Sequence, residues 1–207
     1  MTLAFRWRLP SLNLDNTISD HQPLVFLASL SHLHSPRAAM PMLLEGSCHC
    51  RKVKYTLESH TPVPYQLCQC SICRKVGGYM GSVNIMGNAA SLKFVRGEEL
   101  LVKYKPVLEF GADDTPQKTA TSERVFCSVC SAALWNYHPE YPEWIYPFAS
   151  TIDTQLPKPA AQHFVILRSS CPAYVPTPEG FDVYDDYGPA ASGSIESWHK
   201  KNGCWVE

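Results

Sequence analysis

The sequence lacks a strong excess of either charge and lacks long apolar runs. Its 207 residues carry 18 Lys and Arg against 19 Asp and Glu, which gives a formal net charge of −1. A general nucleic-acid-binding protein usually carries a basic excess. No stretch reaches the roughly 18 consecutive apolar residues of a membrane span. We therefore expect neither nucleic acid nor a membrane among the partners of this chain.

Sustained helical periodicity and internal repeats are also missing. The 17 prolines argue against a helical bundle, because a proline inside a helix costs roughly 3 kcal/mol. Short segments that alternate or are rich in apolar residues, separated by turn residues, predict strands instead. These segments are 53–57, 82–86, 92–95, 101–105, 123–126, 133–137, 144–149 and 163–167. Only residues 74–81 suggest a short helical turn, so the sequence predicts a mainly β domain.

The composition divides the chain into a core at 42–170 and two extensions. Residues 1–41 form an N-terminal extension whose first 14 residues hold two arginines and no acid, as in a mitochondrial presequence. The alternative is that translation starts at Met40 or Met42. Residues 171–207 read as a Pro-rich, acidic C-terminal tail, laid over the domain or partly disordered.

Nine cysteines are the strongest signal, and seven of them fall in three tight groups. The groups are Cys48-x-Cys50, Cys68-x-Cys70-x-x-Cys73 and Cys127-x-x-Cys130. Thiolates at such spacings suit tetrahedral zinc, whereas short pairs close only small loops as disulfides. An odd total also leaves at least one thiol unpaired. Zinc is therefore favoured, while disulfides and a redox or iron–sulfur site stay open as alternatives.

Seven clustered cysteines divide as four and three. Structural zinc sites are closed by four protein ligands, whereas catalytic sites keep three and an open position. The contiguous group Cys68, Cys70 and Cys73 could surround one ion, which leaves the two outer pairs to meet across the chain. The alternative is two closed sites, the second completed by a histidine, Cys171 or Cys204. Otherwise these last two cysteines are ordinary thiols.

The order of these motifs resembles the family of glutathione-dependent formaldehyde-activating enzymes, which includes centromere protein V. The resemblance runs from about residue 43 to 170 and rests on five segments. They are Gly46–Cys50, Cys68–Arg74, Phe94–Leu100, Arg124–Cys130 and Ala149–Asp153.

The resemblance implies a β-tent domain of short antiparallel strands that holds two Zn²⁺ ions per chain. In the family pattern the outer pairs hold a structural zinc and the middle group holds a catalytic one. Carried over, the ligands are Cys48, Cys50, Cys127 and Cys130 for the first ion, and Cys68, Cys70 and Cys73 for the second. The implied reaction joins glutathione and formaldehyde as S-hydroxymethylglutathione, formally a carbon–sulfur lyase activity, or joins another small thiol and aldehyde.

The sequence departs from the family pattern at Ser131, where relatives commonly have glycine, and at an insertion-like polar segment, 106–121. His49 lies between two ligands and is expected to project outward. Gly77 and Gly78 would let a ligand approach the backbone, and with Arg74 and Lys75 they could meet a glutathione carboxylate.

A zinc-stabilised protein-interaction module without catalysis is the alternative to an enzyme. Zinc buffering or redox sensing at the three-cysteine group is a third interpretation. Cysteines that bind metal must stay reduced, which favours the cytoplasm as the location of the protein, or the mitochondrion if residues 1–41 are a presequence.

Overall fold

The computed structural model describes residues 40–159, 163–188 and 194–207. All of them belong to one compact unit, Pro36–Glu207. The expected presequence therefore lies outside the described residues. Of the described helices, none is long and apolar enough to cross a membrane.

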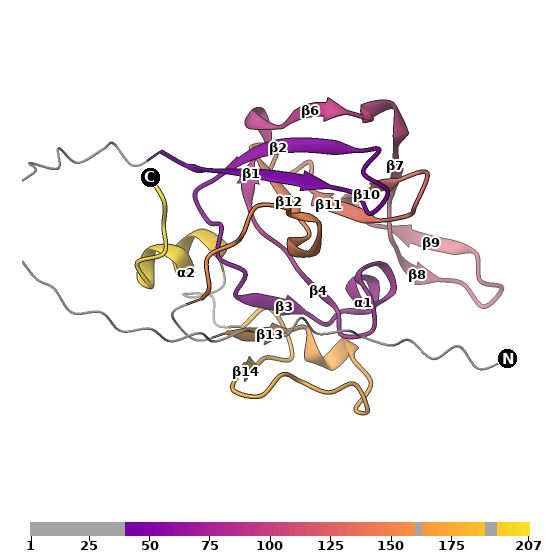
Figure 1. The fold of residues 1–207 in the computed structure, drawn as a ribbon. Coiled ribbons are helices and arrows are strands. Elements are labelled where there is room, and N and C mark those ends of the chain that lie inside the picture. Colours follow the sequence, from indigo (N-terminus) through magenta and orange to yellow (C-terminus); the bar gives the residue numbers. More distant parts are fainter. Residues whose placement is uncertain (1–39, 160–162, 189–193) are drawn as a thin grey trace, which may run out of the picture. The chain divides into compact units, whose positions relative to one another are not determined.

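Three small sheets and a hairpin make up the domain (Figure 1). The first sheet is antiparallel, in the order β1 (Met42–Ser47), β2 (Lys54–Ser59), β6 (Lys93–Arg96). The second has the order β5 (Gly87–Asn88), β12 (Trp144–Pro147), β11 (Ala133–Tyr137), β10 (Glu123–Cys127), β7 (Leu101–Tyr104). The third has the order β14 (Asp182–Val183), β13 (Phe164–Ile166), β3 (Gln66–Cys68), β4 (Ser82–Val83). The hairpin pairs β8 (Val107–Phe110) with β9 (Pro116–Thr119).

The main core lies between the first two sheets, as the alternation of apolar residues predicts. Tyr55 and Leu57 on β2 are fully buried, while Lys54, Thr56 and Glu58, which alternate with them, are only half-buried. The Tyr55 ring meets Trp135 of β11 edge-on, with 5.2 Å between ring centroids. Cys48 and Cys127 belong to the same buried cluster. The prediction of a mainly β fold is confirmed.

Three features differ from the sequence-based expectation. First, β13 pairs in parallel with both β3 and β14, because the 95 residues between β3 and β13 and the 15 between β13 and β14 allow the crossovers that parallel pairing needs. Second, the insertion-like segment 106–121 is itself paired, as the hairpin β8–β9. Third, the described residues form two short α-helices: α1 (Ser71–Gly77), which begins three residues before the helical turn expected at 74–81, and α2 (Ile195–Lys201), which was not expected.

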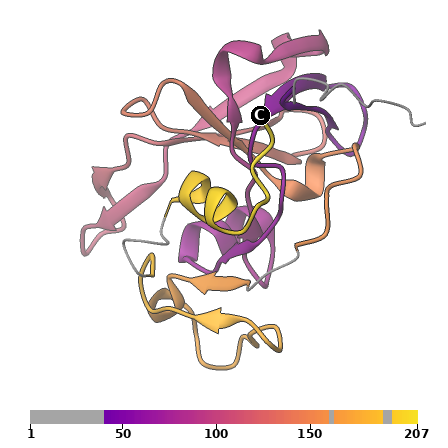
Figure 2. The ribbon, with the colours of Figure 1, turned by 90° about the vertical axis from the view of Figure 1, so that its left-hand side faces the viewer.

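The C-terminal segment is integrated with the domain through β14 and α2. The indole of Trp198 on α2 stacks on Tyr65, with ring centroids 3.9 Å apart and planes 11° apart. Trp198 is 2% exposed, and with Val63 it belongs to a second buried cluster. After α2, which is yellow in Figure 2, the chain returns to β2, where the Val206 amide donates to the His60 carbonyl.

His199 on α2 is buried as a neutral imidazole. Its Nδ1 lies 2.7 Å from the Ile195 carbonyl oxygen, and its Nε2 accepts a hydrogen bond from the Val63 amide. Burial lowers the pKa of this imidazole below 6.5, although the Ile195 contact opposes the change. The unfolded chain therefore binds a proton at a pH where the folded chain does not.

We expect His199 to weaken the fold as the pH falls below about 6.5, by at most about 1.4 kcal/mol per pH unit. Its stabilising contribution is fully present above that pH. Urea unfolding at about pH 7.5 and 5.5 measures the change. The loss should be smaller in His199→Gln than in His163→Gln, a half-buried control whose ring stacks on Phe181. Equal losses in the two variants would contradict the assignment.

Candidate metal centre and adjoining cleft

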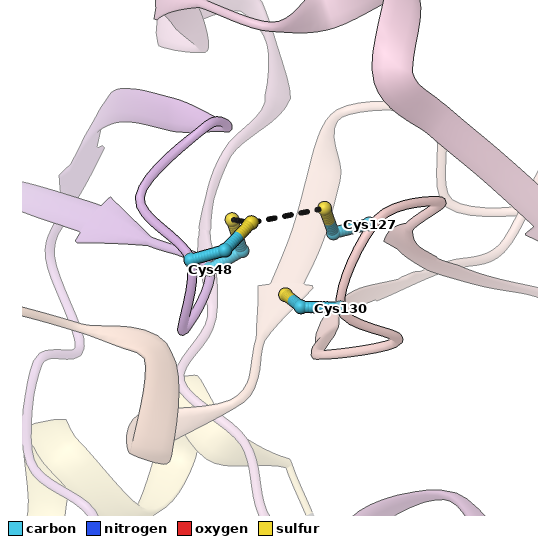
Figure 3. A group of neighbouring side chains, drawn as sticks. Cys48, Cys127 and Cys130 are labelled. Carbon is cyan, nitrogen blue, oxygen red and sulfur yellow. Dashed lines mark hydrogen bonds between the residues drawn. The ribbon is translucent and has the colours of Figure 1, made fainter.

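Four cysteines from two hairpin turns meet at one point. Cys48 and Cys50 lie in the turn between β1 and β2, while Cys127 ends β10 and Cys130 lies in the turn that leads to β11. Figure 3 shows Cys48 facing Cys127 and Cys130 across the gap between the turns. All four sulfurs lie within 4.8 Å of one another. The two outer motifs of the sequence are therefore brought together.

The spacing of these sulfurs fits a metal ion and not disulfides. Cys48 and Cys50 Sγ are 3.4 Å apart, and Cys50 and Cys127 Sγ are 3.9 Å apart. A tetrahedron with zinc–sulfur bonds of about 2.3 Å places its sulfurs about 3.8 Å apart, whereas a disulfide bond is about 2.05 Å long. All nine cysteines are free thiols.

Backbone amides prepare these sulfurs to carry negative charge. The Val53 amide donates to Cys48 Sγ at 3.3 Å, and the Val129 amide donates to Cys127 Sγ at 3.4 Å. Burial opposes ionisation of Cys130, but the amides of Cys50 and Ala132 outweigh it and lower its pKa to about 6. Donors of this kind favour the thiolate, which is the form that binds metal.

The second cluster is local in the chain. Cys68 ends β3, Cys70 is the N-cap of α1, and Cys73 lies in the first turn of that helix. Their sulfurs lie within 4.8 Å of one another, and no fourth Cys, His, Asp or Glu of the described residues joins them. Both cysteine clusters could hold a metal ion, and only the four-cysteine cluster offers a full tetrahedral set.

The negative charge of the three-cysteine cluster is centred on Cys70. Hydrogen bonds from the Cys68 and Cys73 thiols, helped by the amides of Cys73 and Ile72, lower the pKa of Cys70 to about 2. The same contacts raise the pKa of Cys68. These contacts favour the thiolate form of Cys70, which is the form in which a cysteine binds metal.

Gln69 anchors this loop from the side opposite the cysteines. Its side chain is fully buried and accepts a hydrogen bond from Arg168 Nη1 at 3.0 Å, while its Nε2 donates to the Pro176 carbonyl. Arg74 donates to the Gln69 carbonyl and to the Ser170 carbonyl. Contacts with residues 168–176 therefore fix the backbone that carries the three sulfurs.

The three cysteines open onto a cleft of about 520 Å³ between the second and third sheets. Its other polar walls include Asn84, Arg124, Asn136, His138 and Tyr146. None of the lining residues is an Asp or a Glu.

Two hydrogen bonds define the tautomer of His138 in this cleft. Its Nδ1 accepts from the Glu140 amide, so the ring hydrogen is on Nε2, which lies 3.1 Å from Thr121 Oγ1. His138 is therefore neutral in this arrangement, and Arg124 is the permanent cation among the residues that line the cleft.

The residues first expected to meet a ligand carboxylate lie elsewhere. Arg74 is engaged by backbone carbonyls, and neither Arg74 nor Lys75, Gly77 or Gly78 lines the cleft. Gly78 instead ends α1 at a φ of 117°. His49 is exposed, as expected. Cys171 and Cys204 belong to neither cluster.

Sequence reasoning missed the polar residues on the second sheet, notably Arg124 and Asn136. The sequence pattern named Arg124 only as the first residue of the segment Arg124–Cys130. Its strand alternates, with Val125 and Cys127 in the core, and this alternation could have placed Arg124 on the other face of the sheet. Its closeness to the three cysteines depends on long-range topology.

Fold and site together define a mainly β protein with two cysteine clusters suited to metal, one of them open to a cleft. The sequence pattern of the glutathione-dependent formaldehyde-activating enzymes matches residues 43–166. A Halomonas elongata protein that is provisionally named as such an enzyme is 37% identical over 163 residues, 78% of this chain and 98% of that protein. The chain belongs to the glutathione-dependent formaldehyde-activating enzyme family.

Among solved structures, the crystal structure of a Rhodobacter sphaeroides protein matches with a TM-score of 0.41 and 24% identity. The match covers 55% of this chain and 91% of that one.

Gly81 offers a test of how closely the cysteine loop is packed. With a φ of 109°, a Cβ on Gly81 would overlap the Cys68 carbonyl oxygen, whereas a Cβ on Gly78, at a φ of 117°, would meet nothing within 4 Å. Both Gly→Ala changes incur a backbone strain on the order of 1–3 kcal/mol, because residues with a Cβ rarely adopt a φ near +110°. Gly81→Ala should also displace Cys68 and so lower the uptake of added zinc by the three-cysteine cluster, which native mass spectrometry would detect. Equal zinc uptake in the two variants would contradict this packing.

Ser131, directly after Cys130, has a left-handed backbone conformation that glycine adopts more readily. Its φ is 60°, so Ser131→Gly should raise the free energy of unfolding by up to about 1 kcal/mol. Ser128→Gly, in the same turn but without a positive φ, should leave it unchanged or lower it. Chemical denaturation of the metal-loaded variants measures both. A loss of stability in Ser131→Gly would show that its side chain outweighs the backbone strain.

Proposed function

We propose that this chain is a zinc-dependent carbon–sulfur lyase that joins a thiol to formaldehyde or another small aldehyde, with glutathione as the thiol. The family membership and the name of the Halomonas elongata relative support the reaction. The observation that carries the proposal is the contrast between the clusters. One has four cysteines at a hairpin junction, and the other has three at the wall of a cleft.

The donor sets fit two Zn²⁺ ions with different roles. Cys48, Cys50, Cys127 and Cys130 would hold the structural ion, since four thiolates complete a tetrahedron. Cys68, Cys70 and Cys73 would hold the second and leave one position to a substrate. When bound there, zinc would supply the positive charge that keeps an added thiol in its thiolate form.

The reaction breaks the S–H bond of the thiol and forms a bond from its sulfur to the carbonyl carbon. The aldehyde oxygen takes up the proton, and the reverse reaction releases aldehyde. In the cleft, Thr121 Oγ1 accepts the hydrogen on His138 Nε2, so its own hydroxyl hydrogen is free for a substrate oxygen. Rings of Tyr146 and Tyr187 line the same cleft as the sulfurs.

Matched cysteine variants test the proposal. The wild type should bind two zinc ions, measured by native mass spectrometry. Cys70→Ser should lose one ion, stay folded and lose acceleration of thiol–formaldehyde exchange, measured by NMR exchange spectroscopy. Cys48→Ser should lower stability, because removal of a structural-site ligand weakens folding. Cys171→Ser, outside both clusters, should retain both ions and the activity.

Two outcomes would contradict the proposal. Full exchange activity in Cys70→Ser would place the reaction elsewhere. In the second outcome, the protein loses its two zinc ions only on unfolding and accelerates exchange with no thiol. That result would favour a zinc-stabilised protein-interaction module without catalysis.

We also propose that the protein works in a reducing compartment, of which the cytoplasm is the simplest case. All nine cysteines are free, and oxidation of the clustered thiols would remove the metal ligands.

A further inference from the structure

A row of three polar side chains from neighbouring strands of the second sheet lines the cleft. Arg124 on β10 lies opposite Asn136 on β11, and Asn136 lies opposite Tyr146 on β12. Directly opposed residues on neighbouring strands point to the same face of a sheet. All three line the cleft that also contains the three cysteines. The row therefore faces the same space as the open sulfur cluster.

Two atoms of this row are buried without a hydrogen-bond partner. They are Arg124 Nε, a donor, and Asn136 Oδ1, an acceptor. A buried polar group left unpaired costs about 1–3 kcal/mol, and such groups are uncommon in folded proteins. Two of them side by side at the wall of a cleft indicate a place where a ligand completes the hydrogen bonding.

The Arg124 guanidinium is only loosely held by the protein. Its Nη1 donates to Ser122 Oγ at 3.3 Å and to the Glu123 carbonyl at 3.4 Å, both at the long end of the hydrogen-bond range. Among the described residues, no carboxylate forms an ion pair with it, since Glu123 pairs with Lys103. A small rotation would turn its Nε and Nη2 edge toward the cleft.

The charge of the cleft decides what that edge would bind. With zinc and three thiolates the sulfur cluster would be anionic, and no acid lines the cleft to compete for Arg124. The parallel N–H groups of a guanidinium match a carboxylate in bidentate geometry. Asn136 beside it would accept a hydrogen bond from an ammonium or amide N–H.

We propose that Arg124, assisted by Asn136, binds a carboxylate of the substrate thiol and so selects acidic thiols over neutral ones. This inference rests on the proposed function, because that function supplies the substrate thiol. The position of Arg124 also predicts that the cleft binds a carboxylate ligand that cannot react. Arg124 contacts the substrate away from the reacting sulfur. Its contribution is therefore to affinity and orientation.

Kinetics with three thiols separate this role from simple charge balance. Arg124→Gln should lower kcat/KM for glutathione between about 10-fold and 100-fold, mainly through KM. With glutathione diethyl ester and with 2-mercaptoethanol the change should stay below about 2-fold. Arg124→Lys keeps the charge but loses the bidentate contact, so it should restore only part of the activity. Lys93→Gln, exposed on β6, removes the same charge outside the cleft and serves as control.

Equal losses with all three thiols in Arg124→Gln would overturn the inference, because they would show that Arg124 only balances the charge of the sulfur cluster. Zinc content is measured for every variant, so loss of metal is recognised separately.

A second readout separates this inference from the proposed function. S-methylglutathione keeps both carboxylates but has no thiol, and its binding is measured by calorimetry. If the wild type binds it and Arg124→Gln does not, the inference holds even where no thiol–aldehyde exchange is accelerated. Exchange activity without dependence on Arg124 in either assay would leave the proposed function standing and overturn the inference.

Discussion

The convergence of four cysteines from two hairpin turns is the constraint on which the domain depends. Cys50 and Cys127 are 77 residues apart, yet their sulfurs approach to 3.9 Å. This junction joins the first sheet to the second, and Cys48 and Cys127 are themselves buried in the core between them. Packing and sulfur geometry therefore support each other. A metal ion here would stabilise the folded state directly, since unfolding would scatter its ligands.

The three-cysteine cluster, unlike the four-cysteine cluster, comes from one short segment of the chain. Its ligands span residues 68–73 and cannot join distant segments, so the surrounding protein must hold the loop in place. Gln69 and Arg168 do this from the back, through buried hydrogen bonds to the segment that follows β13. Pairing of Cys68 with Ile166 of β13 and with Ser82 of β4 holds the start of the loop from both sides. All three cysteines nevertheless line the cleft.

The sequence could predict those parts of the structure that depend on local pattern. The alternation at 133–137 gives β11 with its observed bounds, and the cysteine spacings identify both clusters. Parallel pairing of β13 with β3 depends on chain segments about 100 residues apart, which no local pattern encodes. Helix α2 is only seven residues long and is stabilised by the stacking of Trp198 on Tyr65. Arg124 was missed because its neighbours across the sheet are set by register.

The position of Arg124 follows from the four-cysteine junction. Cys127 ends β10 in the core, and Arg124 lies three residues earlier on the same strand, where it lines the cleft. A bulge between Val125 and Phe126 accommodates the change in register between these two positions. The junction that holds Cys127 therefore also sets where the backbone of Arg124 lies at the cleft. The two clusters are separate groups of cysteines, but strand β10 links them. It carries Cys127 of the first cluster and Arg124 at the cleft onto which the second cluster opens.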